Sequence, residues 1–547
     1  MNAAPWTVGR YVVETLAANG IDVVFGIPGV HNLELYRGLE LARVRHVLVR
    51  HEQNAVFAAD GYARASGQVA AAFVISGPGV SNALTALAQA WSDSVPLLLV
   101  ASAPLRASLG RGWGVLHELP DQRALVTGVT AFAGSARTDT EVREHLREAF
   151  AALRSARPRP AYIDVPLDLL AEPTSLRPEV FARAAPPAAP PRPALEEALT
   201  LLAAAERPLF ISGGGARGGG TALRHLVESL DAYLVTTVAG KGVVAESHPA
   251  SLGVSLPFAP TQELVAAADV VVAAGTELSE TDFYTSTRLP MNGRLVRIDV
   301  DEQKLRDHYA APVALQGDAA AGLQSLAQGI AARKGIPGRE STAVRRGWRT
   351  AAGDGAAYRA RIEAQLPATA APALAALRAL RESLPADGVV FSDMTQIAYL
   401  GNYAFHAERP GVWFHPSGYG ALGFALPAAL GARIAQPQRP IVALAGDFGT
   451  QFTLQEIMTA VELDLTLPLI VWNNSALGQI RDDMRAAGIT PIGVVARNPD
   501  FVAIAHACGA TGMRVPDAPA LAEALRGALA RPGPTILELN ATEFRGP

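Results

Sequence analysis

The sequence predicts an α/β protein of three doubly wound domains, each with a parallel β-sheet covered by helices on both faces. Three observations lead to this prediction. The chain has 547 residues, too many for one hydrophobic core, and two proline-rich or polar stretches divide it. In each of the three segments, short apolar runs alternate with longer amphipathic ones. The apolar runs lack interleaved polar residues, which is typical of parallel strands buried on both faces.

The two dividing stretches set the expected domain boundaries. Residues 184–193 have the sequence AAPPAAPPRP, and prolines at this density neither continue a helix nor sit in a central strand. Residues 333–371 mix charge, glycine and proline with some helical pattern. We therefore expect domains over residues 1–175, 190–335 and 365–547, each of an ordinary domain size.

The apolar runs give the expected strands in chain order. In the first domain they are residues 47–52, 71–76, 96–102 and 161–166, with a helix over residues 56–65. In the second they are residues 208–213, 232–238, 270–275 and 295–300. In the third they are residues 388–393, 441–447, 467–473 and 535–539, with a helix over residues 454–461. Ligands bind at the carboxyl ends of such strands, so residues just after each strand are the functional candidates.

Composition excludes several classes of function. The chain is 49% hydrophobic and 18% charged, which is typical of a soluble globular protein. A net charge of −4 gives no basic footprint, so we expect neither nucleic acid nor a membrane surface as partner. The single cysteine, Cys508, excludes an intrachain disulfide and any cysteine-cluster metal site. Residues 1–20 lack a signal-peptide pattern, and no uncharged apolar stretch reaches about 18 residues, so we expect a cytoplasmic protein.

A carboxylate and an amide follow two expected strands of the third domain. Residues 441–447 end in Gly446-Asp447, and residues 467–473 lead into Asn473-Asn474. With a backbone carbonyl from the loop beyond, these oxygens suit magnesium, and the helix after Gly446 offers N–H groups to phosphate. Both dipeptides are also common in turns, so the pair alone leaves a plain turn as the alternative.

A second pattern lies in the first domain. The segments Arg50-His51-Glu52-Gln53-Asn54-Ala55 and Ala59-Asp60-Gly61-Tyr62-Ala63-Arg64 are expected to end a strand at Glu52 and to continue as a helix. In isolation, Glu52 is equally well explained as a negative charge that the helix dipole favours at the start of a helix.

Taken together, the two patterns resemble the thiamine diphosphate enzymes, whose diphosphate motif is Gly-Asp-Gly followed at a fixed interval by Asn-Asn. Phe448 replaces the last glycine, which changes backbone freedom and removes no ligand. The resemblance implies that Asp447, Asn474 and the main-chain oxygen of Ala476 bind Mg²⁺ or another divalent metal. It also implies that Glu52 faces N1′ of the aminopyrimidine, where proton exchange helps thiazolium C2 lose its proton.

Three further segments match in order and look like acetolactate-synthase-type sequence: residues 26–29 (GIPG), 76–82 (SGPGVSN) and 417–424 (SGYGALGF). In that family the last segment supplies a bulky apolar residue that bends the cofactor, and Leu422 stands at its position. The resemblance implies the architecture of pyruvate decarboxylases and acetolactate synthases, with pyrimidine-binding, central and diphosphate-binding domains. The cofactor contacts that it implies are Glu52, Pro28, Gly29, Gln396, Gly420, Leu422, Gly446, Asp447, Phe448, Asn474, Ala476, Leu477 and Gly478.

The same resemblance implies an oligomer. In this family the residues that correspond to Glu52 and Asp447 meet only across a subunit interface. We therefore expect a homodimer or homotetramer with its active sites between subunits.

The central domain carries a glycine-rich pattern. Gly213-Gly214-Gly215-Ala216-Arg217-Gly218 follows the strand at residues 208–213 and satisfies G-x-G-x-x-G, with Asp231 at a suggestive spacing. Glycine is so dense here that the pattern arises by composition. Related enzymes use this domain for FAD, for another nucleotide or for nothing. We predict no FAD or other nucleotide, and a structural nucleotide and an NAD-dependent oxidoreductase stay as alternatives.

Two histidines are candidate catalytic residues. His31 and His117 fall in loops that, by the resemblance, face the thiazolium, and His117 stands where acetolactate synthases carry glutamine. A neutral imidazole at such a place shuttles protons or orients a substrate carboxylate.

The segment after Asn474 bears on the substrate. We expect a helix to start at Ser475, with Gln479, Ile480 and Asp483 on one face at the border of the substrate pocket. Gln479 is a catalytic candidate and the other two are substrate candidates, together with His117. Acetolactate synthases carry tryptophan at the position of Asp483, and a buried carboxylate there favours a guanidinium. The alternative is that Asp482 and Asp483 form a solvated face that pairs with Arg481.

Residues 26–39, 50–67 and 116–129 together resemble decarboxylases of 5-guanidino-2-oxopentanoate, the 2-oxo acid of arginine. We therefore expect a lyase that removes carbon dioxide from this 2-oxo acid without oxidation and releases an aldehyde. Carboligation of two 2-oxo acids, as in acetolactate synthases, is the alternative. A non-catalytic homologue or a nucleotide-binding protein is the remote one.

Overall fold

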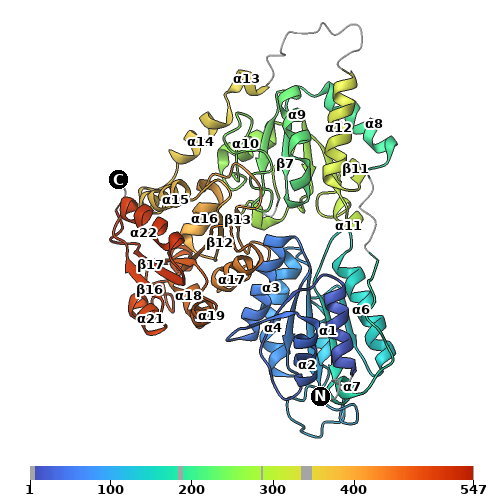
Figure 1. Cartoon of the computed structure of the whole chain (residues 1–547). Helices are drawn as coiled ribbons and strands as arrows, with labels where there is room; N and C mark the ends of the chain where they lie inside the picture. Colours follow the sequence, from blue (N-terminus) through green and yellow to red (C-terminus); the bar gives the residue numbers. More distant parts are fainter. Residues whose placement is uncertain (1–5, 183–188, 285–287, 334–347, 546–547) are drawn as a thin grey trace.

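Three parallel β-sheets, one in each third of the chain, form the framework of the computed structural model (Figure 1). It describes residues 6–182, 189–284, 288–333 and 348–545. Parts of both dividing stretches, residues 184–188 and 334–347, lie outside the described residues. The predicted fold class of three α/β domains is confirmed.

The first sheet has six strands in the order β2-β1-β3-β4-β6-β5. Its strands are β1 (Val23–Gly26), β2 (Arg45–Leu48), β3 (Ala70–Val74), β4 (Leu97–Ala103), β5 (Phe132–Ser135) and β6 (Ala161–Pro166). Its helices are α1 (Val8–Ala18), α2 (Leu33–Ala42), α3 (Glu52–Ser66), α4 (Pro78–Ser92), α5 (Gln122–Thr127), α6 (Asp139–Leu153) and α7 (Leu167–Ala171). Every residue of β3, β4 and β6 is buried, as a sheet covered on both faces requires.

The last sheet repeats this topology in the order β13-β12-β14-β15-β17-β16. Its strands are β12 (Val389–Ser392), β13 (Trp413–Phe414), β14 (Ile441–Gly446), β15 (Leu467–Asn473), β16 (Thr511–Arg514) and β17 (Pro534–Asn540). Its helices are α15 (Ala371–Ser383), α16 (Gln396–Ala404), α17 (Ala425–Ala435), α18 (Asp447–Thr453), α19 (Glu456–Glu462), α20 (Gly478–Ala486), α21 (Phe501–Ala507) and α22 (Ala518–Ala530). In both sheets the order reverses between the first and third strands, which is where such sheets bind ligands.

The middle sheet has five strands in the order β11-β10-β9-β7-β8. They are β7 (Pro208–Ser212), β8 (Tyr233–Thr236), β9 (Val270–Ala274), β10 (Arg294–Asp299) and β11 (Val313–Gln316). Around them lie α8 (Arg192–Ala204), η1 (Gly214–Gly219), α9 (Gly220–Leu230), α10 (Ala259–Ala267), η2 (Glu280–Asp282), α11 (Glu302–Leu305) and α12 (Ala319–Arg333). The short helices α13 (Trp348–Ala352), α14 (Gly355–Glu363) and η3 (Ala368–Ala370) lead to the last domain.

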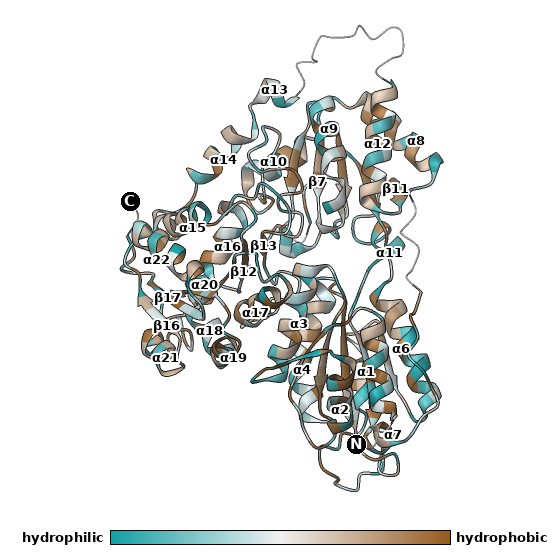
Figure 2. Cartoon of the chain, in the orientation of Figure 1, coloured by the Kyte–Doolittle hydropathy of each residue, from teal (hydrophilic) through white to brown (hydrophobic). Residues whose placement is uncertain are grey.

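Hydropathy follows this layering. The strands between the helices are hydrophobic, whereas the outward faces of α6 and α12 are hydrophilic (Figure 2). Among the described residues, no helix combines the length and the apolar character that crossing a lipid bilayer requires.

The structure corrects four expected element ends. β2 ends at Leu48, and Glu52 is the first residue of α3, because the His51 side chain caps that helix by accepting from Gln53 N–H. The helix expected over residues 454–461 is α19, which begins at Glu456, and a separate short helix, α18, precedes it from Asp447. The helix expected from Ser475 begins at Gly478, because backbone hydrogen bonds tie residues 475–477 to residues 494–496. Finally, α8 begins inside the proline-rich stretch, since proline is tolerated in a first helical turn.

Helices α3 and α17 lie side by side and join the first domain to the last (Figure 1). The two backbones touch, because a Cβ at Gly61 would overlap the carbonyl oxygen of Ala428 and one at Gly431 would overlap that of Ala58. A second link lies at the start of α3. There the buried carboxylate of Glu456 accepts hydrogen bonds from the backbone N–H of Arg50 and from Asn54 Nδ2, both at 2.8 Å. The first and last domains are therefore locked together by backbone contact.

Gly61→Ala should destabilise the protein, because the new methyl group forces the two helices apart at a cost of about 1–3 kcal/mol or more. Calorimetry should show a lower melting temperature. Gly527→Ala is the matched control, since Gly527 lies in α22 with open space around it. There the change should stabilise the helix by about 0.5–1 kcal/mol. Equal melting temperatures for both variants would contradict the backbone contact.

Candidate cofactor and active site

Three helices begin directly after neighbouring strands of the last sheet, at its switch point. α16, α18 and α20 follow β12, β14 and β15, and their N-cap residues Thr395, Gly446 and Leu477 make no side-chain cap. The three starts are close together: a Cβ at Gly446 would lie 2.7 Å from Thr395 Oγ1, and one at Gly478 would clash with the Gln396 amide. Because first-turn N–H groups have no acceptor within the helix, this place suits an anion such as a diphosphate.

Asp447 is buried at the first turn of α18, followed there by Phe448. Its Oδ2 accepts from Asn498 Nδ2 at 2.6 Å, and the same Nδ2 donates to Asn473 Oδ1 at 2.8 Å. Burial raises the pKa of the Asp447 carboxyl, and the hydrogen bond from Asn498 acts in the opposite direction. A bound cation would therefore stabilise the ionised form of this group.

Asn474 lies half-buried just beyond β15. Its Nδ2 donates to Gln396 Oε1 at 3.1 Å, and its Oδ1 accepts from Ala476 N at 3.0 Å. Ala476 pairs with Val495, which fixes the loop that presents the Ala476 carbonyl.

The donor set formed by Asp447, Asn474 and Ala476 fits a hard divalent metal, because it offers one carboxylate and two neutral oxygens and leaves positions for a ligand. In the part of the chain that the structure describes, no three His, Cys, Asp or Glu side chains gather to hold a metal instead. The arrangement thus agrees with a metal that is shared with a bound diphosphate.

The turn at residues 417–423 carries Leu422, which is half-buried. Gly420 and Gly423 have φ of 75° and 85°, a region that favours glycine. Gly423 N–H donates to both carboxylate oxygens of Asp393, at 3.1 and 2.9 Å, and burial raises the pKa of Asp393 to about 6. The end of β12 therefore holds one side of this turn.

Glu52 stands half-buried at the start of α3, and its Oε2 accepts from Asn82 Nδ2 at 2.9 Å. Asn82 belongs to α4, so two helices of the first domain fix this carboxylate. Among the described residues, no hydrogen bond or ion pair links Glu52 to Asp447.

The structure brings His31 and His117 together. Their ring centroids are 5.1 Å apart, and His31 Nδ1 lies 2.5 Å from Ser76 Oγ. Burial, and then the neighbouring His117, lower the pKa of His31 and favour a neutral ring. His117 has φ of 64°, and within the described chain its buried Nδ1 has no partner.

Pro28 and Gly29 lie in the loop after β1 that leads to His31. Gly29 N–H donates to Asn32 Oδ1 at 2.8 Å. A Cβ at Gly29 would lie 2.5 Å from Cγ2 of Ile75, so only glycine fits beside the turn after β3.

Helix α20 carries the three residues expected at the substrate pocket. Gln479 Nε2 donates to Asp483 Oδ1 at 2.9 Å, which confirms their common face. Asp483 and Ile480 are exposed in the single chain, so the expected burial of Asp483 is absent from it. Asp482 pairs with Arg481 and Arg485, and the pairing with Arg481 is the one that the solvated-face alternative expected. Asp482 also accepts a hydrogen bond from Gln396 Nε2 at 3.1 Å. Although burial opposes it, the hydrogen bonds from Arg481 and Gln396 lower the pKa of Asp482.

Several supporting residues were not predicted. Asn82 and Ser76 lie in a segment that drew attention as a family motif, and Asp393 ends an expected strand. Asn498 gave no signal, because it is distant in sequence from the groups that it orients. Gln122 likewise reaches the turn after β3, where its Oε1 accepts from Gly77 N at 2.8 Å.

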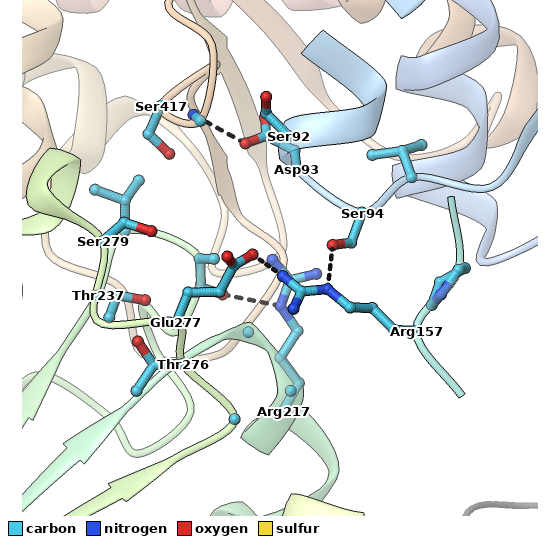
Figure 3. Close-up of a pocket in the computed structure, with 18 of the residues that line it drawn as sticks. Ser92, Asp93, Ser94, Arg157, Arg217, Thr237, Thr276, Glu277, Ser279 and Ser417 are labelled. Carbon is cyan, nitrogen blue, oxygen red and sulfur yellow. Dashed lines mark hydrogen bonds and ion pairs between the residues drawn. The ribbon is translucent and has the colours of Figure 1, made fainter. Parts of the chain in front are cut away.

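A cavity of about 590 Å³ lies elsewhere, at the carboxyl ends of the middle sheet and against both other domains (Figure 3). Arg157 crosses it to reach Ser94 and Glu277, and Arg217 Nε donates to the carbonyl oxygen of Ala239 at 3.0 Å. None of the predicted site residues lines this cavity. It lies at the sheet end where nucleotides bind, so the structural-nucleotide alternative stays a hypothesis.

Asp231 does not support a dinucleotide site. It ends α9 and precedes β8, so it lies at the amino-terminal end of the parallel strands, opposite the glycine-rich turn that follows β7. There it pairs with Arg349 at 2.8 Å. The acid that binds a ribose follows the second strand of such a fold, so this feature of the NAD alternative was misread from its spacing.

Known proteins with similar sequences have the same three-domain organisation. Family models of the thiamine pyrophosphate enzymes match the N-terminal TPP-binding domain over residues 6–125, the central domain over 195–326 and the C-terminal TPP-binding domain over 393–539. A probable 2-ketoarginine decarboxylase of Pseudomonas aeruginosa is 47% identical over 540 residues, covering 98% of this chain and 94% of its own. The acetolactate synthase isozyme 3 large subunit of Escherichia coli is 30% identical over 520 residues, covering 92% and 89%.

Asn498→Ala should weaken metal binding by about 10- to 100-fold, because Asp447 loses the partner that orients it. Loss of this hydrogen bond also raises the pKa of Asp447 further, so metal affinity should begin to fall at a higher pH as the solution is acidified. Calorimetric titration with Mg²⁺ in the presence of thiamine diphosphate measures both effects. The exposed Asn292, in the middle domain, gives the control Asn292→Ala. An unchanged affinity in Asn498→Ala would remove Asn498 from the metal site.

Proposed function

The chain belongs to the thiamine pyrophosphate enzymes, and we propose that it decarboxylates 5-guanidino-2-oxopentanoate without oxidation, releasing an aldehyde and carbon dioxide. The observation that carries the proposal is the position of helix α20, which starts after the loop that carries Asn474 and presents Asp483 at its exposed face. The name of the relative that is 47% identical supports the same substrate.

Thiamine diphosphate, when bound with a divalent metal, supplies a carbon nucleophile and an electron sink for breaking the bond to the carboxylate. Asp447, Asn474 and the carbonyl oxygen of Ala476 would hold the metal. The first-turn N–H groups of α16, α18 and α20, which receive no hydrogen bond from an N-cap side chain, would hold the diphosphate.

Each remaining residue has a role in proton transfer or shape. Glu52, oriented by Asn82, exchanges a proton with N1′ of the aminopyrimidine. Leu422, half-buried in the turn at residues 417–423, would contact the cofactor and help to set its shape. His31, whose lowered pKa favours the neutral ring, and the adjacent His117 would deliver the proton that replaces the lost carboxylate and so completes the aldehyde.

The substrate tail would meet helix α20. Its guanidinium is a planar cation that a carboxylate binds through charge-assisted hydrogen bonds. Asp482 is already occupied by Arg481 and Gln396, whereas Asp483 contacts only the neutral Gln479 among the hydrogen bonds and ion pairs of the described chain. Asp483 is therefore the group available to the tail.

We also propose that the active site forms between two copies of the chain. Exposed apolar side chains surround both half-sites. Around His31 and His117 they are Val30, Leu33, Trp113 and Leu116, and around the metal loop they are Phe452, Ile480, Ile489, Ile492 and Val495. Patches of this kind mark interaction surfaces, and mutual burial would enclose the cofactor away from water.

The purified protein with thiamine diphosphate and Mg²⁺ should release carbon dioxide from 2-ketoarginine with a higher kcat/KM than from pyruvate or phenylpyruvate. Glu52→Gln should lower kcat by about 10²- to 10⁴-fold, since the pyrimidine loses its proton partner. Carbon dioxide assays and product chromatography measure both. Equal turnover of pyruvate with acetolactate as product would instead establish the carboligase alternative.

Asp483→Asn should raise the KM for 2-ketoarginine about 10- to 100-fold, because one charged hydrogen bond contributes about 1.5–3 kcal/mol. The KM for the neutral 2-oxohexanoate should stay the same. Asp482→Asn is the matched control on the same helix and should change the ratio of the two KM values far less. An unchanged ratio in Asp483→Asn would exclude Asp483 as the guanidinium partner.

Two inactive variants should complement each other if the active site lies between subunits. In a dimer of one Glu52→Gln chain and one Asp447→Asn chain, one site carries both substitutions and the other carries neither. Doubly tagged heterodimers should therefore recover about half of the wild-type activity. Absence of recovery would place Glu52 and Asp447 of one chain in the same site.

A further inference from the structure

The turn that carries Leu422 is held by side chains of the first domain of the same chain. Gly418 N–H donates to Asp93 Oδ1 at 2.9 Å, and Ala421 N–H donates to Gln89 Oε1 at 3.1 Å. Figure 3 shows Asp93 facing the turn beside Ser417. These two contacts stand on either side of Gly420, so they fix the backbone directly before Leu422.

The two holding side chains are themselves rigidly fixed. Gln89 is fully buried, and the Asp93 side chain is 10% exposed. Asp93 Oδ2 accepts from Gln89 Nε2 and from Arg64 Nη2, both at 2.7 Å, and Arg64 is bound on its other side by the buried Asp60. Buried groups that satisfy one another in this way have few alternative positions.

Helix α4 connects this turn to the catalytic carboxylate. Gln89 lies in its last two turns, Asp93 follows its end, and Asn82, which orients Glu52, lies in its second turn. Asn82 and Gln89 are two helical turns apart and thus share one face. A displacement of α4 would therefore move the Glu52 partner and the Leu422 turn together.

We propose that Gln89 and Asp93 are positioning residues for the cofactor bound to their own chain, while Glu52 of that chain serves the cofactor of the other subunit. Helix α4 then couples the two cofactor sites of a dimer mechanically. This inference rests on the proposed function, namely on a cofactor that lies between Glu52 and Asp447 of different chains, and it does not depend on the identity of the 2-oxo acid.

The first test needs no 2-oxo acid. Gln89→Met keeps the size of the side chain and removes both of its hydrogen bonds. Displacement of the Leu422 turn should slow deuterium exchange at thiazolium C2 by about 10- to 100-fold. It should also change the near-ultraviolet circular dichroism of the bound cofactor and weaken thiamine diphosphate binding in calorimetry.

Gln436→Met is the matched control. Gln436 also bridges the first and last domains, where its Nε2 donates to the carbonyl oxygen of Ala65, away from the turn. This variant should lower the melting temperature and leave the C2 exchange rate and the dichroism as in the wild type. If Gln89→Met likewise lowers only the melting temperature, Gln89 is merely structural and the proposal is wrong.

Asp93→Asn is a second variant, for use if Gln89→Met does not fold. It changes one atom of the side chain and so preserves the packing of the cluster. It turns an amide toward Arg64 and Gln89, so the Gly418 contact weakens and C2 exchange should slow to a similar extent. Wild-type exchange in Asp93→Asn would overturn the proposal.

Heterodimers decide which site Gln89 serves. With one Glu52→Gln chain and one Gln89→Met chain, the proposal places both substitutions in one site and leaves the other intact. About half of the bound cofactor should then exchange at the wild-type rate. Absence of this fast half would show that Gln89 and Glu52 of one chain serve the same site. The Glu52→Gln and Asp447→Asn pair separately reports whether sites form between subunits at all.

Discussion

The contact between α3 and α17 is the constraint on which the rest of the structure depends. Gly61 and Gly431 let the two backbones touch, and no larger residue fits at either position. This contact sets how the first and last domains face each other. It thereby fixes the position of Glu52, at the start of α3, relative to the last domain. The anchoring of Arg50 and Asn54 by Glu456 and the Asp93 contact with the Leu422 turn both follow from this arrangement.

The cavity of about 590 Å³ lies between domains of a single chain, where Arg157 and Glu277 line it. The half-sites that we propose are rimmed instead by exposed apolar side chains. This cavity is thus not the place where the predicted catalytic residues gather. In the dimer that we propose, the exposed apolar residues around both half-sites are what the second chain would cover.

Sequence patterns were sufficient for the buried parts of the fold and for the groups that follow strands. Strands β6 and β15 match their apolar runs from end to end, because both faces of these strands are buried. Four of the strands that were not predicted, β5, β11, β13 and β16, lie at sheet edges, where short length and partial exposure remove the continuous apolar run. Strand β1 is central yet has only four residues. Asn498 and Gln89 could not be found, because their importance arises from contacts with residues distant in sequence. Asp231 shows the converse, because its spacing from the glycine-rich turn suits a dinucleotide site, whereas it lies at the opposite end of the strands from that turn.

The exposed face of α20 has a consequence for how such an enzyme can diversify. Gln479, Ile480 and Asp483 project from one side of the helix and bear no part of the hydrophobic core, whereas the neighbouring loop that presents Asn474 is tied down by Gln396 and Val494. Replacement of these three side chains would leave the folding of the domain and the loop that presents Asn474 untouched. Single codon changes at these positions can therefore alter which 2-oxo acid such an enzyme accepts, while its stability and its reactive centre stay the same.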